Sequence, residues 1–183
     1  MHADRADLAN LAARVQSLEA LFDRIATTRM AGVPILHPRL AVRAVGFEAV
    51  DEGRAAIGVL VTPWFMNLVW LPLVEGGCAT PVGTSRTRTV GHERLDFLGA
   101  HEDGFGPYES CSLFSPMQEF ADQAAALATA EQVLAILRAP AAPDAQSPQT
   151  APAVPPDSAA PPSKRPAAPR ADRRALLFGR GAP

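Results

Sequence analysis

Between residues 40 and 114 the sequence contains a succession of β-like runs separated by glycine-containing turns. The runs span residues 40–50, 54–62, 65–73, 82–89, 94–98 and 105–114. Asp51, Glu52 and Gly53 join the first two runs, and a turn of this composition typically closes a hairpin. We therefore predict a mostly antiparallel sheet of about five or six strands.

A helical pattern precedes these runs. Apolar residues recur there at spacings of three and four, at Leu8, Leu11, Val15, Leu18, Phe22 and Ile25. This spacing places them on one face of a helix over residues 4–30, which Gly32 and Pro34 end. Packing of this helix on its own domain is favoured over a coiled coil, because the pattern lasts only about three heptads.

A second helical pattern follows the runs. Ser115 provides an N-cap oxygen, Pro116 suits the first helical position, and Gln118 stands where a capping box has Glu or Gln. The apolar side of this helix contains Met117, Phe120, Ala124, Leu127, Leu134 and Leu137, and Pro140 ends it. We therefore predict an α+β domain over residues 1–139, with helices covering one face of the sheet.

The composition changes at the end of this domain. Residues 140–170 are mainly Ala, Pro and Ser, which predicts a disordered linker. Lys and Arg number 11 against 16 Asp and Glu before Pro140, and 6 against 3 after it, so the formal charges of the two parts are −5 and +3. An acidic domain argues against nucleic-acid binding, which requires clustered basic residues.

Cysteine usage and hydropathy limit the function classes further. Cys78 and Cys111 lie far apart and outside any CxxC or Cys/His spacing, so we predict no metal site, no disulfide framework and no cofactor. The N-terminus lacks the layout of a cleavable signal peptide, and glycine, asparagine and prolines interrupt the most apolar stretch, 57–74. A cytoplasmic protein without membrane insertion is expected.

Two segments are candidates for function. The first, TPWFMNLVWLPL at residues 62–73, has prolines near both ends, which predicts an edge strand open to a partner peptide. The alternative is that Trp64, Phe65, Met66 and Trp70 form part of the core. The second segment, 105–123, connects a strand to the proline-started helix.

Cys111 in this second segment raises the alternative of a thiol-dependent enzyme. His37, His92 or His101 would then act as its base. Their spacing does not support this arrangement, and a lone cysteine in a strand is more often a buried small residue.

Several long strings resemble one family. They are LFDRIATTRMAGVPILHPRL from residue 21, GVLVTPWFMNLVWLPL from residue 58 and GPYESCSLFSPMQEFADQAAALATA from residue 106. This pattern resembles the HybE/HoxT/HupJ family of NiFe-hydrogenase assembly chaperones over most of residues 18–139. The resemblance implies an accessory role, without catalysis, toward the hydrogenase small subunit or its twin-arginine export signal. The large subunit and other maturation proteins are further possible partners.

The resemblance has limits. Some relatives carry a rubredoxin module with paired CxxC motifs; this chain does not, so iron binding is not implied. From motif position and surface reasoning, we predict client contacts at Trp64, Phe65, Met66, Asn67, Leu113, Phe114, Ser115, Pro116 and Met117, with their apolar members forming one exposed patch. A structural adaptor that recruits other maturation factors is the remaining alternative.

The C-terminal segment 171–183 is a third candidate for function. Its Arg173, Arg174, Leu176 and Leu177 resemble the core of a twin-arginine export signal. No apolar region follows, so a conventional signal role is excluded. The alternative is that this arginine pair only adds charge to a disordered tail.

Hydrogen exchange tests the predicted boundary. We expect amides of residues 141–169 to exchange at the rate of an unstructured peptide, because their composition cannot bury enough apolar surface to fold. Amides of residues 55–62 should be protected by strand pairing. Slow exchange throughout residues 141–169 would contradict the linker.

Overall fold

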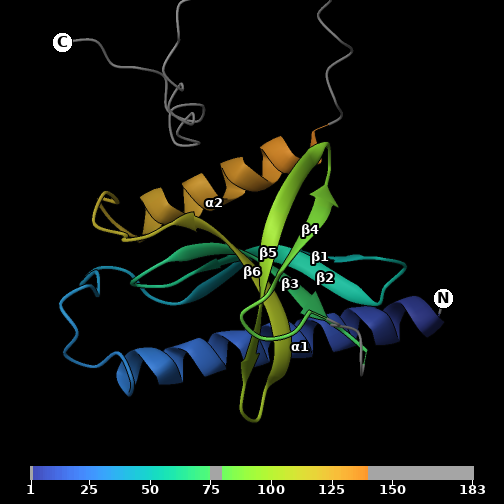
Figure 1. Ribbon diagram of the computed structural model, residues 1–183, viewed down its shortest axis with the longest axis horizontal. Coiled ribbons are helices and arrows are strands. Elements are labelled where there is room, and N and C mark those ends of the chain that lie inside the picture. The colour runs from blue at the N-terminus through green and yellow to red at the C-terminus, as the bar shows by residue number, and fades with distance from the viewer. Residues whose placement is uncertain (1, 75–79, 140–183) are drawn as a thin grey trace, which may run out of the picture. The chain divides into compact units, whose positions relative to one another are not determined.

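The computed structural model describes residues 2–74 and 80–139 and contains the predicted order of elements (Figure 1). Within these residues, six strands form one antiparallel sheet in the order β1-β2-β3-β6-β5-β4. The elements are α1 (His2–Thr27), β1 (Arg43–Val50), β2 (Ala55–Val61), β3 (Met66–Pro72), β4 (Ser85–Val90), β5 (Glu93–Glu102), β6 (Gly106–Phe114) and α2 (Gln123–Arg138). The predicted α+β class is confirmed. The predicted linker and the C-terminal arginine segment lie outside the described residues.

The hairpin between β1 and β2 forms where the sequence predicts it. Asp51, Glu52 and Gly53 all have positive φ angles, of 53°, 55° and 81°. Gly53 tolerates this left-handed conformation at no steric cost, and Asp tolerates it better than most residues. The register Val50↔Ala55 closes the hairpin around them.

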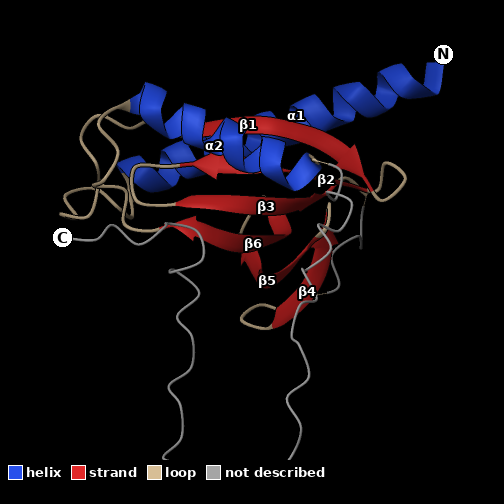
Figure 2. Cartoon of the chain, turned by 90° about the horizontal axis from the view of Figure 1, so that it is seen from above, coloured by secondary structure: helices blue, strands red, loops and turns tan. Residues whose placement is uncertain are grey.

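Strand β2 is buried on both faces. All seven residues of Ala55–Val61 are buried, and six of the seven in β3 are buried too. A sheet has two sides, and such continuous burial requires a covering layer on each. The prediction that helices cover only one face is therefore wrong: α1 packs on one face and α2 on the other (Figures 1 and 2).

Alternation along the strands creates two separate cores. On the α2 face, Ile57, Val59, Leu68 and Phe97 pack with the α2 residues Ala126, Ala130, Leu134 and Leu137. On the α1 face, Leu60, Val69, Leu71 and Tyr108 pack with the α1 residues Leu18, Leu21, Phe22 and Ile25. The predicted α1 stripe is thus confirmed in its C-terminal half, whereas Leu8 is exposed.

The segment 62–73 is not an edge strand. β3 lies inside the sheet between β2 and β6, and the edges are β1 and β4. The prolines do not interrupt it because Pro63 precedes the strand and Pro72 is its last residue. Thr62 closes the turn before the strand, since its Oγ1 accepts from the Phe65 amide at 3.0 Å. Proline near each end therefore limits the length of a strand without placing it at the edge.

Helix α2 begins later than the sequence predicts. Its N-cap is Asp122, whose side chain accepts from the Ala125 amide at 2.9 Å, and not Ser115. Residues 115–122 form turns instead, and Met117 in them is fully buried against the α2-face core. Ser115 and Asp122 are both suitable N-cap residues and lie seven positions apart. The helix begins after Asp122, which aligns the apolar stripe from Ala126 to Leu137 with the sheet.

The remaining strands differ from prediction in length. β4 begins at Ser85 and not at residue 82, while β5 extends to Glu102. Before β4, the chain crosses β5 at Gly99: a Cβ there would lie 2.4 Å from the Pro81 carbonyl oxygen. Only glycine permits this close approach.

A buried ion pair links β4 to the centre of the sheet. The Glu109 carboxylate on β6 is fully buried and accepts from Arg88 Nε at 2.5 Å and Nη2 at 2.9 Å. Thr80 Oγ1 donates to the same carboxylate at 2.6 Å. The Arg88 guanidinium also lies over the Trp70 ring, 4.0 Å from its centroid. These contacts satisfy a charge that would otherwise be costly to bury.

We expect Glu109→Gln to lower the free energy of unfolding by about 3 kcal/mol, because it leaves the part-buried Arg88 charge uncompensated. Urea unfolding at neutral pH measures the difference. The matched control is Glu48→Gln, which removes an exposed pair of similar geometry with Arg138 and should cost less than about 1 kcal/mol. Equal losses in the two variants would contradict this assignment.

Candidate functional site

The two motif segments lie side by side at one end of the sheet. Their strands β3 and β6 are antiparallel neighbours, with Met66 opposite Phe114 and Asn67 opposite Ser112. The loop after α1 joins them there, since the His37 amide donates to the Pro63 carbonyl at 2.8 Å. We call this surface, made of residues 33–37, 62–67 and 113–118, the motif end.

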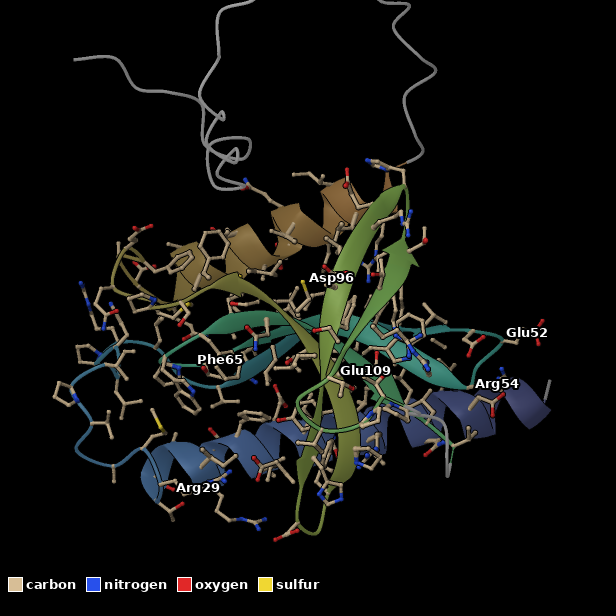
Figure 3. All side chains as sticks on the ribbon, in the orientation of Figure 1. Arg29, Glu52, Arg54, Phe65, Asp96 and Glu109 are labelled. Carbon is tan, nitrogen blue, oxygen red and sulfur yellow. The ribbon has the colours of Figure 1, made fainter. Side chains whose placement is uncertain are left out.

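Side-chain hydrogen bonds hold the three loops of the motif end together. Gln118 Nε2 donates to the Ile35 carbonyl at 2.8 Å, and Ser115 Oγ donates to the Trp64 carbonyl at 3.4 Å. Figure 3 labels Phe65 at this end, whereas Glu52 and Arg54 mark the opposite end of the sheet. The predicted site residues are therefore close in space, although they come from separate segments.

The predicted client-binding residues lie on both faces of the sheet, and four of them pack on the α2 face. Met66 and Met117 are fully buried in the α2-face core, so both are wrong as members of an exposed patch. Met66 packs on the α2 face of the sheet, and Met117 lies within the turns that follow β6. Leu113 and Phe114 are half-buried against the same core.

Trp64 and Phe65 lie on the α1 face. The Phe22 ring of α1 contacts both, with centroid separations of 6.3 Å and 5.6 Å. Both side chains remain half-buried, and Ser115 and Pro116 beside them are exposed. The accessible part of the motif end is thus a rim of partly covered aromatic and polar groups.

The motif end also contains two exposed apolar residues that were not predicted from the sequence. Val33 and Ile35 are each 38% exposed and add apolar surface beside the aromatic residues. Asn67 is half-buried, and its Oδ1 atom is buried and accepts no hydrogen bond from the residues that the structure describes.

Cys111 has the wrong environment for a nucleophile. Burial, and to a lesser degree the Asp96 charge, raise the pKa of its thiol, so the reactive thiolate is disfavoured at neutral pH. His37 is buried and its Nδ1 accepts from the Arg39 amide, while His92 and His101 lie near Glu93 and Asp103. None of these contacts provides Cys111 with a base.

A pocket of about 590 Å³ lies at the opposite end of the sheet. It is formed by the β1–β2 hairpin, the β4–β5 turn and the C-terminal turn of α2, and we call it the hairpin pocket. Its lining residues are Glu48, Val50, Asp51, Ile57, Trp70, Thr89, Val90, Gly91, Leu137 and Arg138. No local sequence pattern marks this pocket, because four distant segments contribute to it.

Two features define the wall of the hairpin pocket. Gly91, with a φ of 60°, lets the β4–β5 turn approach α2: a Cβ there would lie 1.8 Å from the Leu137 carbonyl oxygen. Arg138 Nε donates to Glu48 Oε1 at 2.8 Å, and its Nη2 donates to the Gly46 carbonyl. The pocket thus combines an apolar floor with carboxylates and one arginine at its rim.

Residues 2–74 and 80–139 contain no group of three or more His, Cys, Asp or Glu side chains placed to hold a metal ion. Neither described helix has the length and apolar character that a membrane crossing requires.

Comparisons with known proteins place the chain in a family. The model of the [NiFe]-hydrogenase assembly chaperone HybE matches residues 13–179. Protein HoxT of Cupriavidus necator is 46% identical over 177 residues, covering 91% of this chain and 89% of HoxT. The hydrogenase expression/formation protein HupT of Azotobacter chroococcum is 42% identical over 128 residues, covering 70% and 84%.

A solved structure supports the fold. The solution structure of HybE from Escherichia coli matches with a TM-score of 0.55 and 24% identity, covering 92% of this chain and 91% of that chain. The family assignment rests on the sequence matches, which extend over most of the chain. This chain belongs to the HybE family of NiFe-hydrogenase assembly chaperones.

Proposed function

We propose that this chaperone acts in the cytoplasm on an immature NiFe-hydrogenase subunit, holding the small subunit or its twin-arginine signal peptide until maturation is complete. The observation that carries the proposal is the meeting of the two motif strings at the motif end. Residues far apart in sequence contribute there to one accessible rim. The proposed partners include the large subunit and other maturation proteins.

The composition of the motif end suits peptide binding. Trp64 and Phe65 offer ring surface that is already held in place by Phe22, so a partner orders few new side-chain rotamers when it binds. Pro116 and Ile35 extend the apolar surface. Aromatic anchors in a preformed rim are typical of binding hot spots.

The remaining predicted residues have supporting roles in this proposal. Met66 and Met117 fill the core beneath the rim, and Leu113 and Phe114 pack beside them. Phe114 is fixed by an edge-to-face contact with Phe120, with centroids 5.3 Å apart. These side chains shape the loops that the client touches.

Electrostatics favours a basic client. The part of the chain before Pro140 has a formal charge of −5. A signal peptide with an arginine pair is attracted to such a domain, and this attraction should weaken as salt screens it.

Variants of the rim test client binding. We expect Val33→Ser with Ile35→Ser to lower the affinity for a hydrogenase small-subunit precursor about tenfold, because two exposed apolar contacts are lost. The control is Val82→Ser with Leu98→Ser, an exposed apolar pair on another part of the sheet, which should bind normally. Affinities measured by titration with purified precursor, together with unchanged thermal unfolding, decide the result. Unaltered binding by the first variant would exclude the motif end as the client site.

Replacement of the cysteine separates binding from catalysis. We expect Cys111→Ser to leave both the capture of the precursor and the yield of mature hydrogenase within about twofold of the original, because the neutral thiol serves as a small half-buried side chain. The measurement compares copurified precursor with processed subunit in cells. A variant that captured the precursor but abolished maturation would instead support a thiol-dependent enzyme.

The adaptor alternative predicts a different result when the proteins that copurify with the chaperone are identified. An adaptor would copurify with other maturation proteins and show no direct affinity for the purified precursor. Direct binding by the isolated chaperone therefore supports the client-holding function and contradicts the adaptor.

A further inference from the structure

We infer that the free edge of β4 binds an extended acidic segment of a partner protein as an added strand. This surface is distinct from the motif end, so the inference goes beyond the proposed function and does not depend on it. It comes from the difference between the two edges of the sheet, the direction of the β4 backbone groups and the charge of the strand.

The sheet has two edges, β1 and β4, and side chains from both helices close the first. The Ala44 amide donates to Glu19 Oε1 of α1 at 2.7 Å, and the Gly46 carbonyl accepts from Arg138 Nη2 of α2. The pairing of β1 with β2 also contains a register shift in this region, which bends a strand. Occupied backbone groups and a bend protect an edge from further pairing.

The β4 edge lacks these protections within the part of the chain that the structure describes. Its six residues pair with β5 in one unbroken register, from Ser85↔Leu98 to Val90↔Glu93. Every residue of β4 is exposed or half-buried. Apart from the ladder with β5, no described residue forms a hydrogen bond with the β4 backbone. This edge is therefore the one at which the sheet can be extended.

The ladder between β4 and β5 determines which backbone groups face outward. The Gly99 amide donates to the Thr84 carbonyl at 2.9 Å, so these two residues form a hydrogen-bonded pair. In an antiparallel ladder such pairs recur at every second residue. The even-numbered residues of β4 therefore bond to β5, whereas the N–H and C=O groups of Ser85, Thr87 and Thr89 point away from it. An added strand pairs with these outward groups.

Side-chain contacts hold β4 in the extended conformation that an added strand requires. Arg88 Nη2 donates to Glu109 Oε1 at 2.9 Å, and the guanidinium lies over the Trp70 ring. On the opposite face, Thr87 Oγ1 donates to Asp96 Oδ1 at 2.6 Å. Because the edge is already ordered, a partner strand that binds there loses little free energy to ordering of the chaperone.

The charge of β4 determines the kind of segment that fits. Arg86 and Arg88 are its two charged residues, and both lie on the α2 face because strand residues alternate. Arg86 is exposed and forms no ion pair with a residue that the structure describes. A partner strand with Asp or Glu at alternate positions would place a carboxylate beside this guanidinium, and cross-strand pairs of opposite charge are stabilising.

The same arginines disfavour a second copy of this chain as the occupant. In the antiparallel arrangement centred on Thr87, which pairs all of the outward groups, Arg86 of one copy lies opposite Arg88 of the other. Like charges directly opposite one another destabilise a strand pair. The edge is thus protected from pairing with itself and open to a strand of opposite charge.

Titration of the full chain with a synthetic peptide tests the edge. The probe is a short capped peptide in which glutamate alternates with threonine or valine, and the control has lysine in place of glutamate. We expect the glutamate peptide to bind about tenfold more tightly and to shift the amide NMR signals of Ser85, Thr87 and Thr89. An absence of binding at millimolar peptide, equal affinities for the two peptides, or shifts centred on the motif end or on β1 would each overturn the inference.

Proline at position 87 blocks the edge without removing a ladder bond, since the Thr87 N–H faces outward. We expect Thr87→Pro to lower the affinity for the glutamate peptide about tenfold, because a donor is lost and the ring obstructs the partner strand. The matched control, Thr87→Val, loses the same hydroxyl contact with Asp96 but keeps the N–H, and it should bind within about twofold of the original. Equal affinities of the two variants would contradict strand addition.

Replacement of Arg86 tests the charge contact and leaves the backbone unaltered. Because this side chain is exposed, Arg86→Gln should retain the thermal unfolding of the original chain and lower the affinity for the glutamate peptide about fivefold. An unchanged affinity would overturn the preference for an acidic partner. Sedimentation without peptide examines the second copy: a self-association that Thr87→Pro abolished would assign the edge to another copy of this chain and overturn the inference.

These measurements require no hydrogenase component. If the peptide does not bind while the precursor does, only the inference about β4 is wrong. If the peptide binds at β4 and the precursor does not bind, the proposed client function is wrong and the added strand remains.

Discussion

Burial of β2 on both of its faces is the constraint on which the rest of the architecture depends. A strand with seven consecutive buried residues cannot lie in a sheet that is open to water on one side. The chain meets this requirement with one helix from each end of the domain, α1 on one face and α2 on the other. Since the helices occupy the faces, the loops at the two ends of the strands supply both candidate surfaces, the motif end and the hairpin pocket.

The elements with local signals could be predicted, whereas those set by long-range packing could not. The turn at Asp51 to Gly53 and the apolar stripe ending at Ile25 are encoded within a few residues, and both appear as expected. The position of β3 inside the sheet depends on its neighbours β2 and β6, so Pro63 and Pro72 were misleading as edge signals. Likewise, Asp122 prevailed over Ser115 because of how α2 meets the sheet.

The same contrast between local signals and long-range packing applies to the two candidate surfaces. Family resemblance and strand pairing bring the two motif strings together, but sequence alone did not reveal that Met66 and Met117 are buried beneath the rim. The hairpin pocket had no local signature at all. Its lining joins Glu48, Trp70, Gly91 and Leu137, which come close only because the twisted sheet brings the tip of the β4–β5 hairpin to the C-terminal end of α2 (Figure 1).

Two arginine–glutamate pairs show how burial assigns different roles to similar contacts. Arg88 and Glu109 are shielded from water and reinforced by Thr80 and Trp70, so breaking them leaves a buried charge and they serve to fix β4. Arg138 and Glu48 have comparable geometry but are solvent-exposed, so water and other ions compete with them at little cost. The pair that holds the strands together is therefore unsuited to exchange. The exposed pair can break without loss of the fold, and it lies in the lining of the hairpin pocket.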